Sequence, residues 1–196
     1  MSSSSILIRN MILAALFAAL LAISGQIAIP IGPVPITLQT MMVLLVGAIL
    51  GSRWGTISVF VWILLAAVGA PVLSGGAGGI GILFGPTGGY IFGFLITAFL
   101  VGWSLERMGR NKQVAWWKLL LVFLIGSVVV INAVGFPWFL FVSHLPFSMD
   151  IFNKVFVVFL PGDIAKAVLA AILTYSLYRA MPSFSPQERV KKASKA

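Results

Sequence analysis

The chain has 196 residues, of which 60% are hydrophobic and only 9% are charged. Soluble domains carry charge on roughly a quarter of their residues, so this composition excludes a soluble globular protein and a disordered chain. Thirteen basic residues against four acidic ones give a net charge of +9, but the bases lie between long apolar runs, which indicates membrane topology rather than binding to nucleic acid.

The apolar runs predict an all-α integral membrane protein, formed as a single domain over residues 1–196. Turn residues and charges divide it into six transmembrane helices, with a basic tail at 182–196. The first helix is expected to be retained, and a cleaved signal peptide is the alternative. The predicted spans are 8–24, 37–50, 56–69, 90–105, 116–136 and 163–180.

Three long connections separate these spans. The first, 26–39, holds Pro30, Pro33 and Pro35 and cannot be a regular helix, because each proline lacks an N–H group and disfavours helix in the residue before it. The second, 70–89, is rich in glycine and uncharged. The third, 137–161, mixes apolar and polar residues and indicates a loop with a short helix at the membrane surface.

The basic residues predict the orientation. If both termini are cytoplasmic, only Lys154 and Lys166 fall elsewhere, and no other arrangement gives a comparable asymmetry. The three long connections then lie on the outer side, where we expect them to cover an outward-facing ligand cavity. The bases assigned to the cytoplasmic side are Arg9, Arg53, Arg107, Arg110, Lys112, Lys118, Arg179, Arg189, Lys191, Lys192 and Lys195.

Asp163 and Lys166 are the charges that topology does not explain. Their spacing of three places them on one face of the sixth helix, just after Pro161 and Gly162, which suit a helix start. Ionisable groups inside membranes are rare and mark ligand sites or pathways. We therefore expect a site for a polar ligand. The alternative is an ion pair that only anchors the helix at the interface.

The glycine-rich segment 75–90 is the second unusual feature. An uncharged loop without side chains can fold inward over a cavity and let the backbone approach a ligand closely; a flexible connector is the alternative. Thr87 and Gln39 are further binding candidates, although either could merely cap a helix.

Small residues recur along the first helix. Ala14, Ala18 and Ala22 are spaced by four, as are Ala15 and Ala19. This spacing allows close helix contact in lipid, so the stripe fits a partner surface and internal packing about equally well.

Three segments together resemble BioY, the biotin-binding S-component family of energy-coupling-factor (ECF) transporters. These segments span most of residues 24–170: QIAIPIGPVPITLQT at 26–40, GAPV at 69–72 with the glycine run and GPTGGY at 85–90, and LPGDIAK at 160–166. The resemblance implies a multi-pass protein of the bacterial plasma membrane. It would capture biotin from outside and deliver it inward with a membrane coupling protein and two cytoplasmic ATPases.

The resemblance also implies that Tyr90, Asp163 and Lys166 belong to the binding site, and that the helix-one stripe Ala14, Ala18 and Ala22 contacts the coupling protein. Asp163 would accept hydrogen bonds from the ureido N–H groups of biotin, while Lys166 donates to its carbonyl. The opposite pose, with Lys166 on the carboxylate, stays open.

We expect a transport subunit rather than an enzyme. The single histidine, His144, has no metal-ligand partner, no cysteine is present, and no nucleophile lies beside a base. The sequence therefore predicts no catalytic residue, no metal and no cofactor, with biotin as a transported ligand. The alternatives are an S component for another vitamin and an intramembrane enzyme that uses Asp163 and Lys166 as acid and base.

Overall fold

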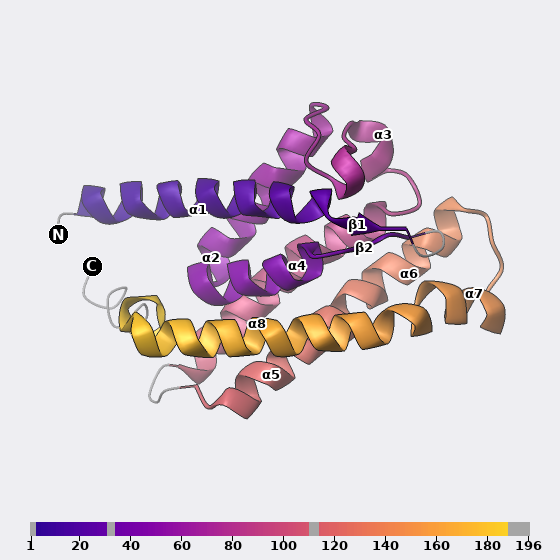
Figure 1. The fold of residues 1–196 in the computed structure, drawn as a ribbon. Helices are drawn as coiled ribbons and strands as arrows, with labels where there is room; N and C mark the ends of the chain where they lie inside the picture. Colours follow the sequence, from indigo (N-terminus) through magenta and orange to yellow (C-terminus); the bar gives the residue numbers. More distant parts are fainter. Residues whose placement is uncertain (1–2, 31–33, 110–113, 188–196) are drawn as a thin grey trace.

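A computed structural model describes residues 3–30, 34–109 and 114–187, which form a bundle of long helices (Figure 1). The predicted all-α membrane fold is confirmed, with one short two-stranded ladder among the described residues. The elements in chain order are α1 (Ser3–Gln26), β1 (Ala28–Ile29), β2 (Ile36–Thr37), α2 (Gln39–Ala67), the 3-10 turn η1 (Ser74–Gly76), α3 (Ile80–Leu83), α4 (Gly88–Met108), α5 (Trp116–Leu124), the π-helix η2 (Ile125–Val130), α6 (Ile131–Val142), α7 (Met149–Val155), the 3-10 turn η3 (Val157–Phe159), α8 (Leu160–Ala180) and the 3-10 turn η4 (Pro182–Phe184).

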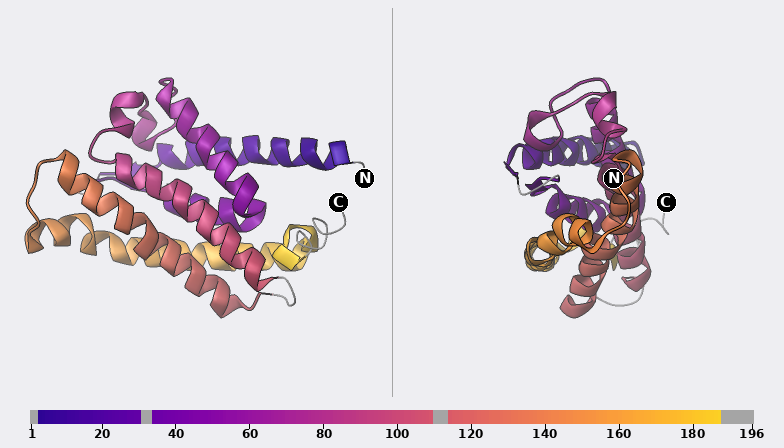
Figure 2. Two further views of the ribbon diagram at one scale, coloured as in Figure 1. Left: turned by 180° about the vertical axis from the view of Figure 1, so that it is seen from behind. Right: turned by 90° about the vertical axis from the view of Figure 1, so that its right-hand side faces the viewer.

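Helix α2 contains a sharp turn at Gly51, so its two halves form a V (Figures 1 and 2). Gly51 has φ 84° and ψ −179°, a conformation that side chains disfavour and glycine tolerates. The second half starts at Ser52, whose backbone N–H and hydroxyl donate to the Glu106 carboxylate at 3.0 and 2.7 Å. Glu106 is half-buried and caps this helix start.

Five helical stretches in the described part of the chain are long and apolar enough to cross a membrane. The second of them covers most of both predicted spans, 37–50 and 56–69, and contains the sharp turn at Gly51 between them. The number of crossings and the orientation therefore stay predictions. The stretches are Ser4–Gln26, Gln39–Ala67, Gly88–Met108, Trp116–Val142 and Met149–Ala180.

The third long connection is shorter than expected. The fifth span was predicted to end at 136, but α6 continues through Pro137 to Val142. The short helix predicted within this connection is α7, where the Ser148 hydroxyl accepts a hydrogen bond from the Ile151 N–H at 3.2 Å. Pro161 and Gly162, which suit a helix start, lie in the first turn of α8, where a proline needs no N–H partner.

The first two connections are ordered where the structure describes them. Residues before and after 31–33 pair as an antiparallel ladder, with Ala28 opposite Thr37 and Ile29 opposite Ile36. The glycine-rich connection contains η1 and α3. The Trp62 indole N–H, from inside the bundle, donates to the Val72 carbonyl at 3.0 Å and so attaches this connection to α2. Of the predicted basic tail, η4 is described, and residues 188–196 lie outside the described residues.

The predicted partner stripe on α1 faces into the protein. Ala14 and Ala18 are only 5% and 3% exposed, and the Ser58 hydroxyl of α2 donates to the Ala14 carbonyl at 2.8 Å. Ala22 is partly buried against the same core, whereas Ala15 and Ala19 lie on the exposed face. This corrects the expected position of Ala14 and Ala18, because the small side chains serve close packing of α1 on α2.

Candidate ligand site

A cavity of about 210 Å³ lies at the end of the bundle where the first two connections meet the starts of α4, α6 and α8. Its walls are mostly apolar, and the polar groups are few, as in ligand sites generally. The residues that line it are Val34, Pro35, Ile36, Thr37, Gln39, Thr40, Leu73, Ser74, Ala77, Ile82, Thr87, Tyr90, Ile91, Phe94, Ile131, Asn132, Val155, Phe159, Asp163 and Lys166.

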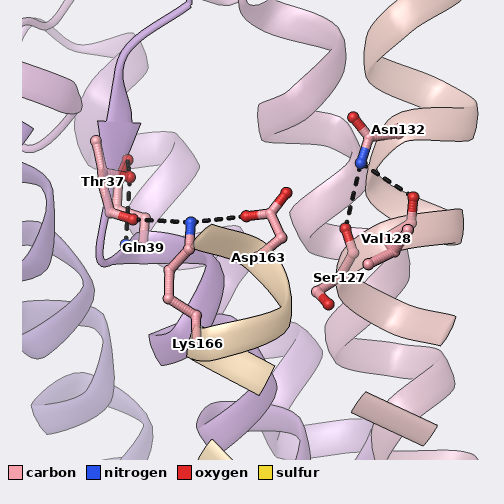
Figure 3. A network of polar contacts seen from close by, with 7 residues as sticks. All are labelled: Thr37, Gln39, Ser127, Val128, Asn132, Asp163 and Lys166. Atoms are coloured by element: carbon pink, nitrogen blue, oxygen red, sulfur yellow. Dashed lines mark hydrogen bonds and ion pairs between the residues drawn. The ribbon is translucent and has the colours of Figure 1, made fainter. Parts of the chain in front are cut away.

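Asp163 and Lys166 form an ion pair in the wall of this cavity. The Lys166 Nζ lies 2.7 Å from the Asp163 Oδ1, and the two side chains are 10% and 11% exposed. Lys166 also donates to the Thr37 carbonyl at 3.3 Å, which joins α8 to β2 (Figure 3). The pair is therefore almost removed from solvent but still borders the open volume, a position in which charge-assisted hydrogen bonds to a ligand are strong.

Thr37 and Gln39 continue this polar network. The Gln39 backbone N–H donates to the Thr37 hydroxyl, which donates in turn to the Gln39 Oε1, both at 3.3 Å. The Gln39 Nε2 is buried without a hydrogen-bond partner, and so is the Tyr90 hydroxyl. A buried donor without a partner costs about 1–3 kcal/mol, so these two groups favour an acceptor placed in the cavity.

Tyr90 is held in place by a glycine on the facing helix. A Cβ added at Gly135 of α6 would lie 2.3–2.6 Å from the Tyr90 ring carbons, so the ring packs directly on the glycine backbone. About one turn after Gly135 on α6, Trp138 packs in the same way on Gly89 of α4, and its indole N–H donates to the Gly85 carbonyl at 3.0 Å. Gly89 and Gly135 thus allow α4 and α6 to approach closely at the cavity.

Asn132 is a cavity residue that the sequence analysis did not single out. Its Nδ2 donates to the carbonyls of Ser127 and Val128 at 3.3 and 3.0 Å, directly after the π-helix η2 (Figure 3). π-Helical turns often occur at functional sites. The available signal was an amide side chain within the otherwise apolar run that ends at Phe136.

The five predicted binding residues all line this single cavity. Asp163 and Lys166 come from α8, Tyr90 from α4, and Gln39 from the start of α2. Thr87 precedes α4 at the cap position, but its side chain makes no capping hydrogen bond. The capping alternative for Thr87 therefore has no support in its contacts.

The chain is similar to one protein family, to several of its members and to a solved structure. The family model described as the BioY family matches residues 1–183. The biotin transporter BioY of Rhizobium etli is 40% identical over 171 residues, covering 84% of this chain and 90% of the relative. That of Lactococcus lactis subsp. cremoris is 36% identical over 173 residues, covering 87% and 90%. A 2.1 Å crystal structure of the S-component for biotin from an ECF-type ABC transporter matches with a TM-score of 0.83 and 35% identity, over 91% of this chain and 95% of that one.

Proposed function

Because the chain belongs to the BioY family, we propose that it is the biotin-binding S component of an ECF-type transporter. It captures biotin from outside in the cavity lined by Asp163 and Lys166. The observation that carries this proposal is the buried ion pair that borders a mostly apolar cavity. Biotin combines a polar ureido ring with an apolar thiophane ring and chain, which match the ion pair and the apolar walls of the cavity.

The remaining hydrogen-bonding capacity of the pair suits the ureido ring. An ammonium group has three donors, and Lys166 uses two of them on Asp163 and the Thr37 carbonyl, which leaves one for the ureido carbonyl. Asp163 retains acceptor sites for the ureido N–H groups. Tyr90 and Gln39 supply the unpartnered donors described above.

The reverse pose would place the biotin carboxylate on Lys166. That ammonium already has the Asp163 carboxylate at 2.7 Å. A second carboxylate there would add an anion beside an anion in a poorly solvated place, which is unfavourable. We therefore favour the pose with the ureido ring at the ion pair and the carboxylate toward the glycine-rich connection.

Delivery inward requires partners. The sequence contains no ATP-binding loop motif, and we propose that a membrane coupling protein and two ATPase subunits supply the energy. On α1, Ala15 and Ala19 are exposed while Ala14 and Ala18 are buried. We therefore assign the coupling contact to the Ala15–Ala19 face, with the connections at 26–39 and 70–89 acting as lids over biotin.

Equilibrium binding of biotin, thiamin and riboflavin to the purified full chain tests the substrate. We expect saturable binding of biotin at a stoichiometry of one, and no competition by a large excess of either other vitamin. Saturable binding of thiamin or riboflavin without binding of biotin would contradict the proposal. Recovery of a chemically altered ligand would favour the enzyme alternative.

Gly135→Ala is expected to weaken biotin binding through Tyr90. The new Cβ would overlap the ring, and the ring can shift only toward the cavity or by separating α4 from α6. Overpacking of this kind costs about 1–3 kcal/mol, which corresponds to a loss of affinity of roughly 5- to 150-fold. Isothermal titration calorimetry with biotin measures this loss of affinity.

Gly162→Ala is the matched control. It makes the same change at the start of α8, directly before Asp163, but a Cβ there meets no atom within 4 Å. Its biotin affinity should equal that of the unsubstituted protein. Equal affinities for the Gly135 and Gly162 variants would show that the position of Tyr90 does not matter for binding.

A further inference from the structure

At the end of the bundle opposite the cavity, four cationic side chains each lie over an aromatic ring. We call this end, defined by Arg53, Arg107, Lys118 and Arg179, the basic end. The Ser52–Glu106 contact brings the turn of α2 to the end of α4, and α5 starts shortly after α4 stops. The distances to the ring centroids are 6.0 Å for Arg53 over Trp54, 4.9 Å for Arg107 over Trp103, 5.3 Å for Lys118 over Trp117 and 6.0 Å for Arg179 over Tyr175.

These cations keep hydrogen-bond donors available. A guanidinium that stacks on a ring uses its face, so its in-plane N–H groups still point outward. No ion pair to another described residue engages any of the four. The nearby carboxylate, Glu106, is occupied by the Ser52 N–H and hydroxyl. The basic end therefore presents positive charge with donors that no described carboxylate occupies.

Exposed apolar stripes run along the helices toward these cations. On α4, Ile96, Phe99 and Trp103 are spaced at helical intervals on one face, and Arg107 follows one turn later. The same holds on α5, where Lys118 is followed by exposed residues along the helix. Leu121 on α5 and Ile125 and Val129 on the following π-helix η2 are 49%, 47% and 56% exposed. A molecule that binds the cations thus also lies against an apolar helix face.

We propose that the basic end is a binding site for anionic phospholipids, with phosphatidylglycerol as the probe. The phosphate oxygens accept hydrogen bonds from the ring-stacked cations, which suits the geometry of arginine in particular, while the acyl chains lie along the exposed stripes. A soluble protein partner would meet the cations but not the stripes, which continue into the hydrocarbon region. The combination of cation, interfacial ring and apolar stripe on one helix therefore favours a lipid.

Native mass spectrometry of the purified full chain from mixed micelles tests this proposal. With equal phosphatidylglycerol and phosphatidylcholine, we expect phosphatidylglycerol to be retained preferentially. Arg107→Gln should weaken its retention about fivefold, the usual effect of one basic residue near an anionic surface. Substituting Arg53, Arg107, Lys118 and Arg179 together by glutamine should abolish the preference.

Two further variants separate a built site from general charge. Lys154→Gln removes one exposed cation at the cavity end, where Lys154 pairs with Asp150, and should retain phosphatidylglycerol normally. Trp103→Leu keeps Arg107 but removes its ring and should reduce retention by less than Arg107→Gln. Unchanged biotin affinity establishes that each variant is folded. Equal lipid preference in the Arg107 variant and the unsubstituted protein, or an equal loss in the Lys154 variant, would overturn the proposal.

Discussion

Asp163→Asn and Lys166→Ala are each expected to lower the affinity for biotin by roughly 10- to 150-fold, because each removes a charge-assisted hydrogen bond worth about 1.5–3 kcal/mol. The alanine variant should also be the less stable of the two. It leaves the Asp163 carboxylate, 11% exposed, without any cation, and an uncompensated buried charge is strongly destabilising. In Asp163→Asn, by contrast, the Lys166 ammonium keeps the Thr37 carbonyl and gains the new amide oxygen as acceptors. Isothermal titration and thermal unfolding in detergent measure the two effects.

The same chemistry on the surface supplies a control. Asp150 and Lys154 also form an ion pair at 2.7 Å on one helix, but their side chains are 70% and 64% exposed. Exposed pairs contribute little, so Asp150→Asn and Lys154→Ala should leave both biotin affinity and thermal stability unchanged. An almost unchanged affinity for biotin in both the Asp163 and Lys166 variants would contradict the assignment of these residues to the binding site.

Biotin amide, which lacks the negative charge, separates the two ligand poses. With the ureido ring at the ion pair, Lys166→Ala should lower the affinity for biotin and for its amide by similar factors. If Lys166 instead binds the carboxylate, the substitution should affect biotin strongly and the amide little. The second result would reverse the proposed pose while keeping Lys166 in the site.

Tryptophan in place of Ala15 and tryptophan in place of Ala18, one turn apart on α1, are expected to have different effects. Ala15 is exposed, so Ala15→Trp should leave biotin binding intact and prevent co-purification with the coupling protein and ATPases. Ala18 is 3% exposed in the contact with α2. Ala18→Trp should therefore disrupt that packing, lower thermal stability and reduce biotin binding as well, since overpacking costs about 1–3 kcal/mol or more.

Co-purification and biotin titration of the two variants in parallel check this expectation. Ala15→Leu, a smaller change on the same exposed face, should weaken assembly less than Ala15→Trp. If Ala15→Trp assembles normally, the coupling contact lies elsewhere. If Ala18→Trp retains biotin binding and loses only assembly, α1 must move away from α2 when the partner binds.

The sequence predicted the main helices better than their ends. Pro137 and Pro161 were both taken as boundaries, because proline disfavours helix. Helix α6 instead continues through Pro137 to Val142, and α8 begins before Pro161. A proline can lie in the first helical turn or be accommodated by neighbouring helices, and the local sequence does not distinguish these cases from a break.

The charged residues of the site could be predicted from the sequence more readily than its neutral groups. An Asp and a Lys three residues apart inside an apolar helix stand out in any membrane sequence. Asn132 and the Thr37 carbonyl do not, because an amide within an apolar run and a backbone oxygen carry no distinctive pattern. The contact of Glu106 with Ser52 is equally invisible in the sequence, because it depends on how α4 packs against the turn of α2.

By itself, the sequence determined that the protein is an all-α membrane protein with an ionisable pair in one of its helices, since hydropathy, charge and short spacing are properties of the linear chain. Only the tertiary structure decided which groups meet that pair and which alanine face is free. Lys166 and the Thr37 carbonyl are 129 positions apart, and Ala14 and Ala15 are adjacent yet face opposite environments. Such contacts depend on how whole helices pack, and no local pattern encodes the packing partner.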